Sequence, residues 1–126
     1  MARSRPIFEA ALEGRSDEEL RTAARLLEAE LRDEIRAPYF TGSEVVAAAR
    51  RARERGVEVV LFDEGGGESL TDETRHRLES KAIAALNSSS ALSRVVIRLE
   101  PPQRRRVATI LVGDRLEEVF ASDRKN

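Results

Sequence analysis

Three short valine-rich runs, with a helical pattern between the first two, constrain this chain more than any other feature. The runs are VEVVLFD, RVVIRLE and RRVATILV. Each has the length and the composition of a strand, and the first is typical of a buried strand. Between the first and the second run, Leu78, Ala82 and Leu86 recur at helical spacing. Two strands joined by a helix are expected to pair in parallel through a right-handed crossover.

A long helix is expected first, over residues 17–36. Ser16 and Glu19 form a capping box at its start, and Pro38 ends it because the residue before a proline avoids helical angles. Apolar residues follow one stripe of this helix, and charges fill its other face. The stripe consists of Leu20, Ala23, Ala24, Leu27, Leu31 and Ile35. We expect it to be buried against the domain or against a second copy of the chain.

Turn residues delimit the remaining elements. A second helix is predicted over about 43–55 and ends at Gly56, where a left-handed residue is favoured. The helix between the strands covers about 72–87. The dipeptide GD at 113–114 is typical of a two-residue hairpin, so a fourth strand follows, RLEEVFAS. Because it holds few apolar residues, this strand is expected at an edge of the sheet.

The predicted fold is a two-layer α+β domain with helices on one face of a four-stranded mixed sheet. The element order is helix, helix, strand, helix, strand, strand, strand, and the last three strands form an antiparallel meander. A chain of 126 residues is the size of one domain, so 1–126 is assigned to a single unit. Residues 1–15 are expected to be either a short docked helix or a loosely docked N-terminal arm.

The composition excludes several kinds of site. The chain has no cysteine, which rules out disulfides and cysteine zinc sites, and His76 is its only histidine, which rules out a multi-histidine metal centre. No apolar run reaches the roughly 20 residues that a membrane helix needs, and the N-terminus lacks the apolar region of a signal peptide. We therefore expect a cytoplasmic protein with no membrane partner and no cofactor.

The segment DEGGGESLTDETRH, residues 63–76, places three glycines before a helix, as phosphate-binding loops do. It has neither the lysine of a Walker loop nor the glycine spacing of a Rossmann fingerprint, and carboxylates surround it. The favoured interpretation is a flexible turn between a strand and a helix. The alternative is a small metal-dependent enzyme in which Asp63, Glu64 and Glu68 hold magnesium at the carboxyl end of a strand.

Arginine clusters point to a different function, because the net charge of -1 leaves anion binding to local patches. If the second and third helices lie side by side, their basic residues could form a groove for an RNA backbone. The candidate nucleic-acid-binding residues are Arg50, Arg51, Arg53, Arg75, Arg77, Lys81, Arg94, Arg98, Arg104, Arg105 and Arg106. The alternative is an ordinary solvated arginine-rich surface.

A family resemblance supports the RNA hypothesis. The order Leu70, Thr71, Asp72 followed by an arginine and an ExK pair, then LSRVVIRLE and RRRVATILVGDRLEEVFAS, resembles the ribosome hibernation-promoting factors over residues 57–122. The resemblance implies a non-enzymatic, ribosome-associated module that contacts ribosomal RNA or the small ribosomal subunit and regulates translation. The family's last, basic helix has no counterpart after Phe120, and the first 55 residues match nothing in the family.

A third hypothesis rests on the helix over 17–36. Its leucine stripe and charged flanks suit a partner helix, so the chain can also be interpreted as a protein-interaction or scaffold domain that forms a homodimer through this helix. Its regular helix caps would equally suit a designed α+β domain.

Overall fold

A computed structural model describes residues 16–121, and the predicted N-terminal arm, 1–15, lies outside the described residues. The elements are α2 (Asp17–Arg36), η2 (Pro38–Phe40), α3 (Glu44–Glu54), β1 (Glu58–Asp63), η3 (Gly67–Ser69), α4 (Asp72–Ser88), β2 (Arg94–Leu99), β3 (Arg106–Val112) and β4 (Arg115–Phe120). The predicted α+β class, element order and four-stranded mixed sheet are confirmed.

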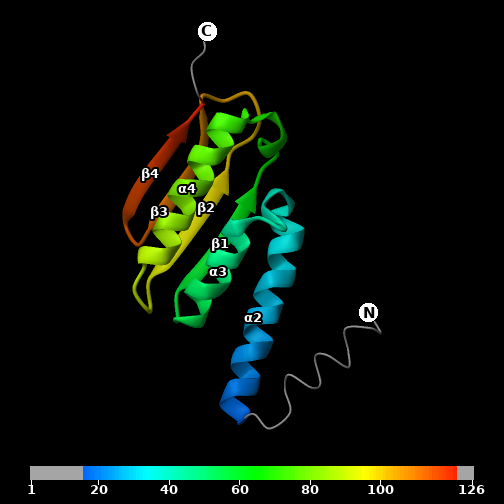
Figure 1. Ribbon diagram of the computed structural model, residues 1–126, viewed down its shortest axis with the longest axis vertical. Helices are drawn as coiled ribbons and strands as arrows, with labels where there is room; N and C mark the ends of the chain where they lie inside the picture. Colours follow the sequence, from blue (N-terminus) through cyan, green and yellow to red (C-terminus); the bar gives the residue numbers. More distant parts are fainter. Residues whose placement is uncertain (1–15, 122–126) are drawn as a thin grey trace.

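The four strands lie in the sheet in chain order, β1-β2-β3-β4. β1 and β2 are parallel, and α4 forms the connection between them (Figure 1). β2–β3 and β3–β4 are antiparallel, and Gly113 turns the last hairpin with a φ of 61°. β4 lies at the edge of the sheet, as predicted, and Val119 is its only buried residue.

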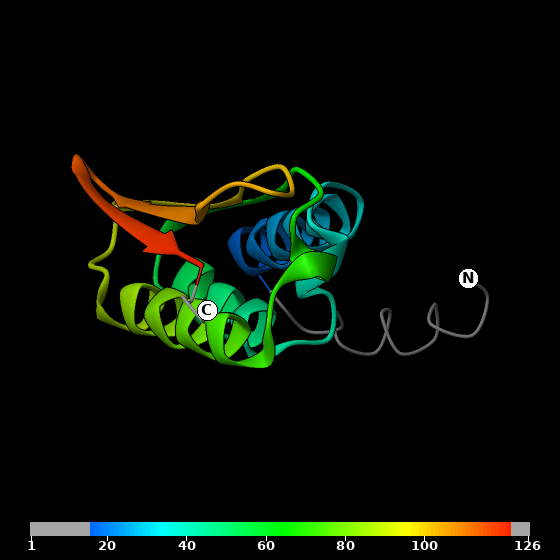
Figure 2. The ribbon, with the colours of Figure 1, turned by 90° about the horizontal axis from the view of Figure 1, so that it is seen from above.

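The helices are not all equivalent in their position on the sheet. Figure 2 shows α3 and α4 beneath one face, side by side, while α2 lies beyond β1 at the edge of the sheet, next to α3. The prediction of helices on one face therefore describes α3 and α4, whereas α2 packs at the sheet edge. No helix within residues 16–121 is long and apolar enough to cross a membrane.

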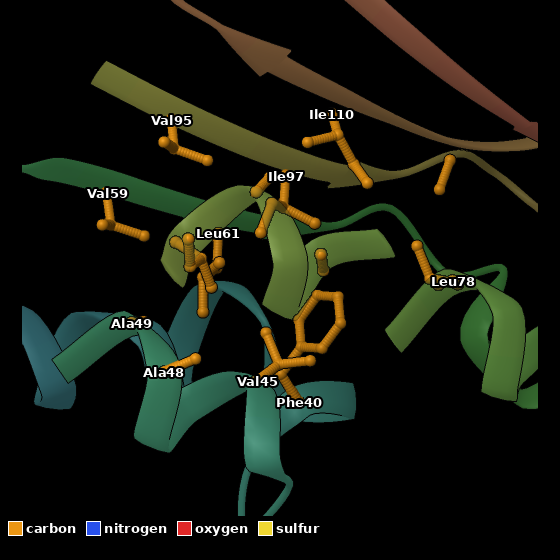
Figure 3. Packing of buried hydrophobic residues seen from close by; sticks show 14 of the residues in the cluster. Phe40, Val45, Ala48, Ala49, Val59, Leu61, Leu78, Val95, Ile97 and Ile110 are labelled. Atoms are coloured by element: carbon orange, nitrogen blue, oxygen red, sulfur yellow. The ribbon is translucent and has the colours of Figure 1, made fainter. Parts of the chain in front are cut away.

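One hydrophobic core fills the space between the sheet and the pair α3–α4 (Figure 3). Ile97 and Ile110 point down from the central strands, and Phe40 and Leu78 meet them from the helical layer, all fully shielded from solvent. α3 contributes mostly alanines to this layer, including Ala48, which lets the helix backbone lie close to its neighbours.

The glycine-rich turn after β1 is tightly packed. A Cβ atom built on Gly66 would overlap the carbonyl oxygen of Glu100, and one built on Gly67 would overlap the ring of Tyr39. Both glycines are buried, and Gly65 has a φ of 109°, in the left-handed region. The predicted turn is present, but two of its three glycines serve close contact with the β2–β3 link and η2 rather than flexibility.

Candidate functional site

The outward face of α2 carries the largest row of exposed apolar side chains in the described part of the chain. Leu27, Leu31 and Ile35 are 40%, 52% and 80% exposed. Ala24 is also exposed, and Leu20 is half-buried. These five residues, called the leucine face below, belong to the stripe predicted from the sequence. The described residues of the domain leave it largely uncovered.

A different face of α2 packs against the domain. Leu26 and Ala29 on this face are half-buried, and Asp33 is buried beside β1 and α3. On a helix with 3.6 residues per turn, Leu26, Ala29 and Asp33 lie roughly opposite the centre of the leucine face. α2 therefore has two distinct faces, and the more apolar of the two points away from its own sheet.

A buried ion pair fixes the orientation of α2. Arg53 on α3 donates hydrogen bonds to both carboxylate oxygens of Asp33, at 2.8 and 3.1 Å, and a third to the carbonyl of Val59 at 2.7 Å. Both charged side chains are only 9% exposed. A second pair, Arg50 to Glu30 at 2.7 Å, lies nearer the surface. Because these contacts hold α2 against rotation about its axis, the leucine face is held outward.

The ion pair between Asp33 and Arg53, called the α2 clamp below, was not predicted from the sequence. Asp33 follows Leu26 and Ala29 by seven and four positions, on the face that packs inward. A carboxylate in line with an apolar face was the one signal that pointed to a buried partner. The stronger leucine pattern concealed it, because that pattern was expected to be buried against the domain or against a second copy, and in the structure a different face of α2 packs on the domain.

Charged residues flank the leucine face. Glu28 and Arg32 form an i,i+4 ion pair at 3.3 Å. Arg21 and Glu34 have no ion pair with any other residue of the described part of the chain. At the C-terminal end of the helix, the guanidinium of Arg36 lies 5.8 Å from the centre of the Phe62 ring. The face thus has an apolar centre and charged margins, as helix-pairing surfaces do.

Two of the three predicted basic residues of α3 lie toward α2. Arg50 and Arg53 are paired with Glu30 and Asp33, as described above. Glu30 and Glu54 raise the pKa of the Arg50 guanidinium, through hydrogen bonds to it and through their negative charge. Arg51 is exposed and has no ion pair within residues 16–121.

The predicted basic residues of α4 lie elsewhere. Arg77 donates to the carbonyl of Phe120, and Lys81 pairs with Glu117 at 2.7 Å, so both reach toward β4. Arg75 pairs with Asp72 in its own first turn at 2.8 Å. Arg50 and Arg53 therefore reach toward α2, whereas Arg77 and Lys81 reach toward β4, and the structure does not bring these two pairs of residues together.

The sheet arginines are also partnered. Arg94 pairs with Glu58 at 3.5 Å and Arg98 with Glu64 at 2.7 Å, on the sheet face that carries no helix. Arg104 in the link to β3 and Arg106 at the start of β3 lie 3.6 and 3.2 Å from the carboxylate of Glu100, which is 1% exposed. Arg106 also pairs with Glu118 at 2.8 Å. Arg105 is exposed and has no ion pair within the described residues.

The carboxylates of the glycine-rich turn have their own partners. Asp63 accepts a hydrogen bond from the backbone N–H of Gly65 at 2.8 Å, and Glu64 holds Arg98. Glu68 is exposed. Within residues 16–121 no three Asp, Glu or His side chains lie close enough to hold a metal ion, so the arrangement gives the magnesium hypothesis no support.

A hollow lies between the start of α4 and the β2–β3 link. Its volume is about 250 Å³, and Thr71, Thr74, Glu100 and Arg104 are among the residues that line it. Thr71 and Thr74 bond to one another at 3.0 Å, and Glu100 lies between Arg104 and Arg106. The two hydroxyls are thus engaged with each other, whereas the buried Oε2 of Glu100 accepts no hydrogen bond within the described residues and has only its ion pair with Arg106.

Comparison of the chain with known protein families, with curated proteins and with solved structures gave no match. The resemblance to the ribosome hibernation-promoting factors therefore stays a prediction from the sequence.

Proposed function

We propose that this chain is a protein-interaction module that binds an amphipathic helix along the leucine face of α2. The observation that carries the proposal is the exposure of Leu27, Leu31 and Ile35 on one side of a helix whose other side is clamped to the domain. A contiguous apolar row bordered by charges is typical of a surface that a partner covers. Its spacing suits the anchors of a helical partner.

The α2 clamp matters for affinity as well as for orientation. Full burial of a leucine side chain stabilises a complex by about 1.5–3 kcal/mol, and ordering a loose helix on binding costs part of that gain. Because Arg53 already holds α2 in place through Asp33, the leucine face is ordered before a partner arrives. We therefore expect binding at this face to proceed with little free-energy cost for ordering α2.

Fluorescence polarisation with a panel of labelled amphipathic peptides tests the proposal. Each peptide carries leucines at heptad a and d positions, and the panel varies the charges beside them. We expect at least one peptide to bind, and Leu31→Glu to weaken its binding at least tenfold. Leu116→Glu is the matched control, because Leu116 on β4 is 53% exposed and Leu31 is 52% exposed. Equal binding by the two variants, or no binding by any peptide, would contradict the proposal.

RNA binding and the cytoplasmic location stay predictions from the sequence. Apart from Arg51 and Arg105, every candidate phosphate-binding residue has a protein partner, so RNA would have to exchange these contacts. Exposed ion pairs contribute only about 0–1 kcal/mol each, so the exposed basic residues can exchange partners at low cost, whereas the buried pair of Arg53 with Asp33 is too costly to break. Filter binding at low salt measures it, and the predicted affinity falls steeply as salt rises.

A further inference from the structure

We infer that the partner of the leucine face is a second copy of this chain, with the two α2 helices antiparallel. The inference rests on the proposed function and names its partner. In this arrangement Leu20 lies opposite the partner's Leu31, and Ala24 lies opposite the partner's Leu27. By two-fold symmetry each contact occurs twice, so four residues of the leucine face form the interface, and Ile35 lies beyond it.

The spacing of the apolar residues supports this register. Leu20, Ala24, Leu27 and Leu31 are separated by four, three and four positions, which is the alternation of d and a positions in a heptad. In an antiparallel pair, a positions of one helix pack against d positions of the other. Pairing position 20 with 31 and position 24 with 27 places an apolar side chain in every layer.

Charge complementarity favours the antiparallel direction. In this register Arg21 faces the partner's Glu28 on one flank of the interface. Arg21 has no ion pair within its own described residues, and Glu28 is 71% exposed although it also contacts Arg32. Two such intermolecular pairs form, one at each end of the contact.

A parallel pair would lack these ion pairs. It would place Glu28 beside the partner's Ala23 and would bring together the acidic first turns of both helices, which contain Asp17, Glu18 and Glu19. Like charges at the same end of two paired helices repel, and the helix dipoles add to that repulsion. The antiparallel pair keeps the acidic ends apart.

Sedimentation velocity of the full chain over a range of concentrations tests self-association. We expect a concentration-dependent dimer, and we expect Leu31→Glu to raise the dimer Kd at least tenfold while Leu116→Glu leaves it unchanged. Arg21→Glu should weaken the dimer by a smaller factor, and the added change Glu28→Arg should restore it. A dimer that persists unchanged in Leu31→Glu overturns the inference.

Cysteine cross-linking tests the direction of the helices, because the chain has no cysteine of its own. We expect an equal mixture of the single variants Leu20→Cys and Leu31→Cys to form a disulfide-linked dimer under mild oxidation. Each variant alone should cross-link far less. Efficient cross-linking of Leu20→Cys with itself would indicate a parallel pair and would overturn the antiparallel arrangement.

The outcomes also separate this inference from the proposed function. A chain that stays monomeric, whose stability is unchanged by Leu31→Glu and which still binds helical peptides, overturns the second copy but keeps the interaction module. A monomer in which Leu31→Glu lowers the urea midpoint of unfolding strongly has its leucine face covered within its own chain. That result overturns both.

Discussion

Arg53 joins three elements at one point, because its guanidinium bonds to Asp33 of α2 and to the carbonyl of Val59 in β1. The carbonyl lies on the strand whose outer edge has no neighbouring strand. A single side chain of α3 thus attaches α2 to the domain and satisfies a polar group at the sheet edge.

Asp33→Ala is expected to lower the free energy of unfolding by about 3–5 kcal/mol, because it leaves the buried guanidinium of Arg53 without its carboxylate. Urea denaturation followed by circular dichroism measures the change. Glu30→Ala removes the neighbouring ion pair with Arg50, whose side chain is 52% exposed. This variant should lower the free energy of unfolding by at most about 1 kcal/mol. Similar losses in the two variants would show that the Asp33 pair is not special.

Gly66→Ala is expected to destabilise the fold by about 1–3 kcal/mol, since its new methyl group would meet the backbone carbonyl of Glu100. Gly42→Ala provides the control. Gly42 has a φ of 79° and open space around it, so its cost is conformational alone, about 1 kcal/mol. If the turn were only a flexible linker, Gly66→Ala would be neutral or stabilising in thermal unfolding.

Stability at alkaline pH should depend on Tyr39. Burial raises the pKa of its hydroxyl above the ordinary value of 10.0, and the nearby Arg75 opposes part of that rise. The unfolded chain therefore releases this proton at a lower pH than the folded chain does. The free energy of unfolding should fall as the pH rises above about 10 toward the folded pKa.

Tyr39→Phe removes the titrating group and is expected to flatten this alkaline decline. Urea unfolding at pH 9 and at pH 11, for the wild type and the variant, gives the comparison. Changes in other groups affect both proteins equally. Parallel pH profiles for the two proteins would show that Tyr39 does not cause the decline.

Arg55→Ala should destabilise α4 rather than α3, although Arg55 is the residue that caps the C-terminus of α3. Its guanidinium donates to the carbonyls of Leu86 and Ser89 at 2.7 and 3.1 Å, in the last turn of α4. Loss of these bonds is expected to cost about 1–3 kcal/mol, since charged donors make the stronger hydrogen bonds. Hydrogen exchange should increase first at the C-terminal turn of α4. An increase confined to α3 would contradict this assignment.

Local signals predicted most of the fold. The capping box of Ser16 and Glu19, the cap at Thr71 and the left-handed Gly56 are all present, and the helix over 17–36 has the predicted bounds. These features depend on neighbours in sequence, which the printed chain shows directly. The packing face of α2 was not predictable in this way, because Asp33 is stabilised by Arg53, which lies 20 positions further along the chain.

The ion-pair partners of the basic residues could not be predicted from the sequence either. Arg50 and Lys81 lie on neighbouring helices, and no local signal in the sequence separates them. Their partners, Glu30 and Glu117, belong to α2 and β4, which lie on different sides of the helix pair. Composition identifies charged residues, but only tertiary structure determines which opposite charge each one meets.

The parallel pairing of β1 with β2 sets an order of assembly. The hairpin β3–β4 joins neighbouring residues and closes within microseconds, whereas β1 must wait for the whole of α4 before its partner strand is available. On a growing chain α2 is made before any strand that it packs against. The leucine face therefore has a fixed orientation only after Arg53 and β1 have been made, so we expect binding through this face to follow the folding of the domain.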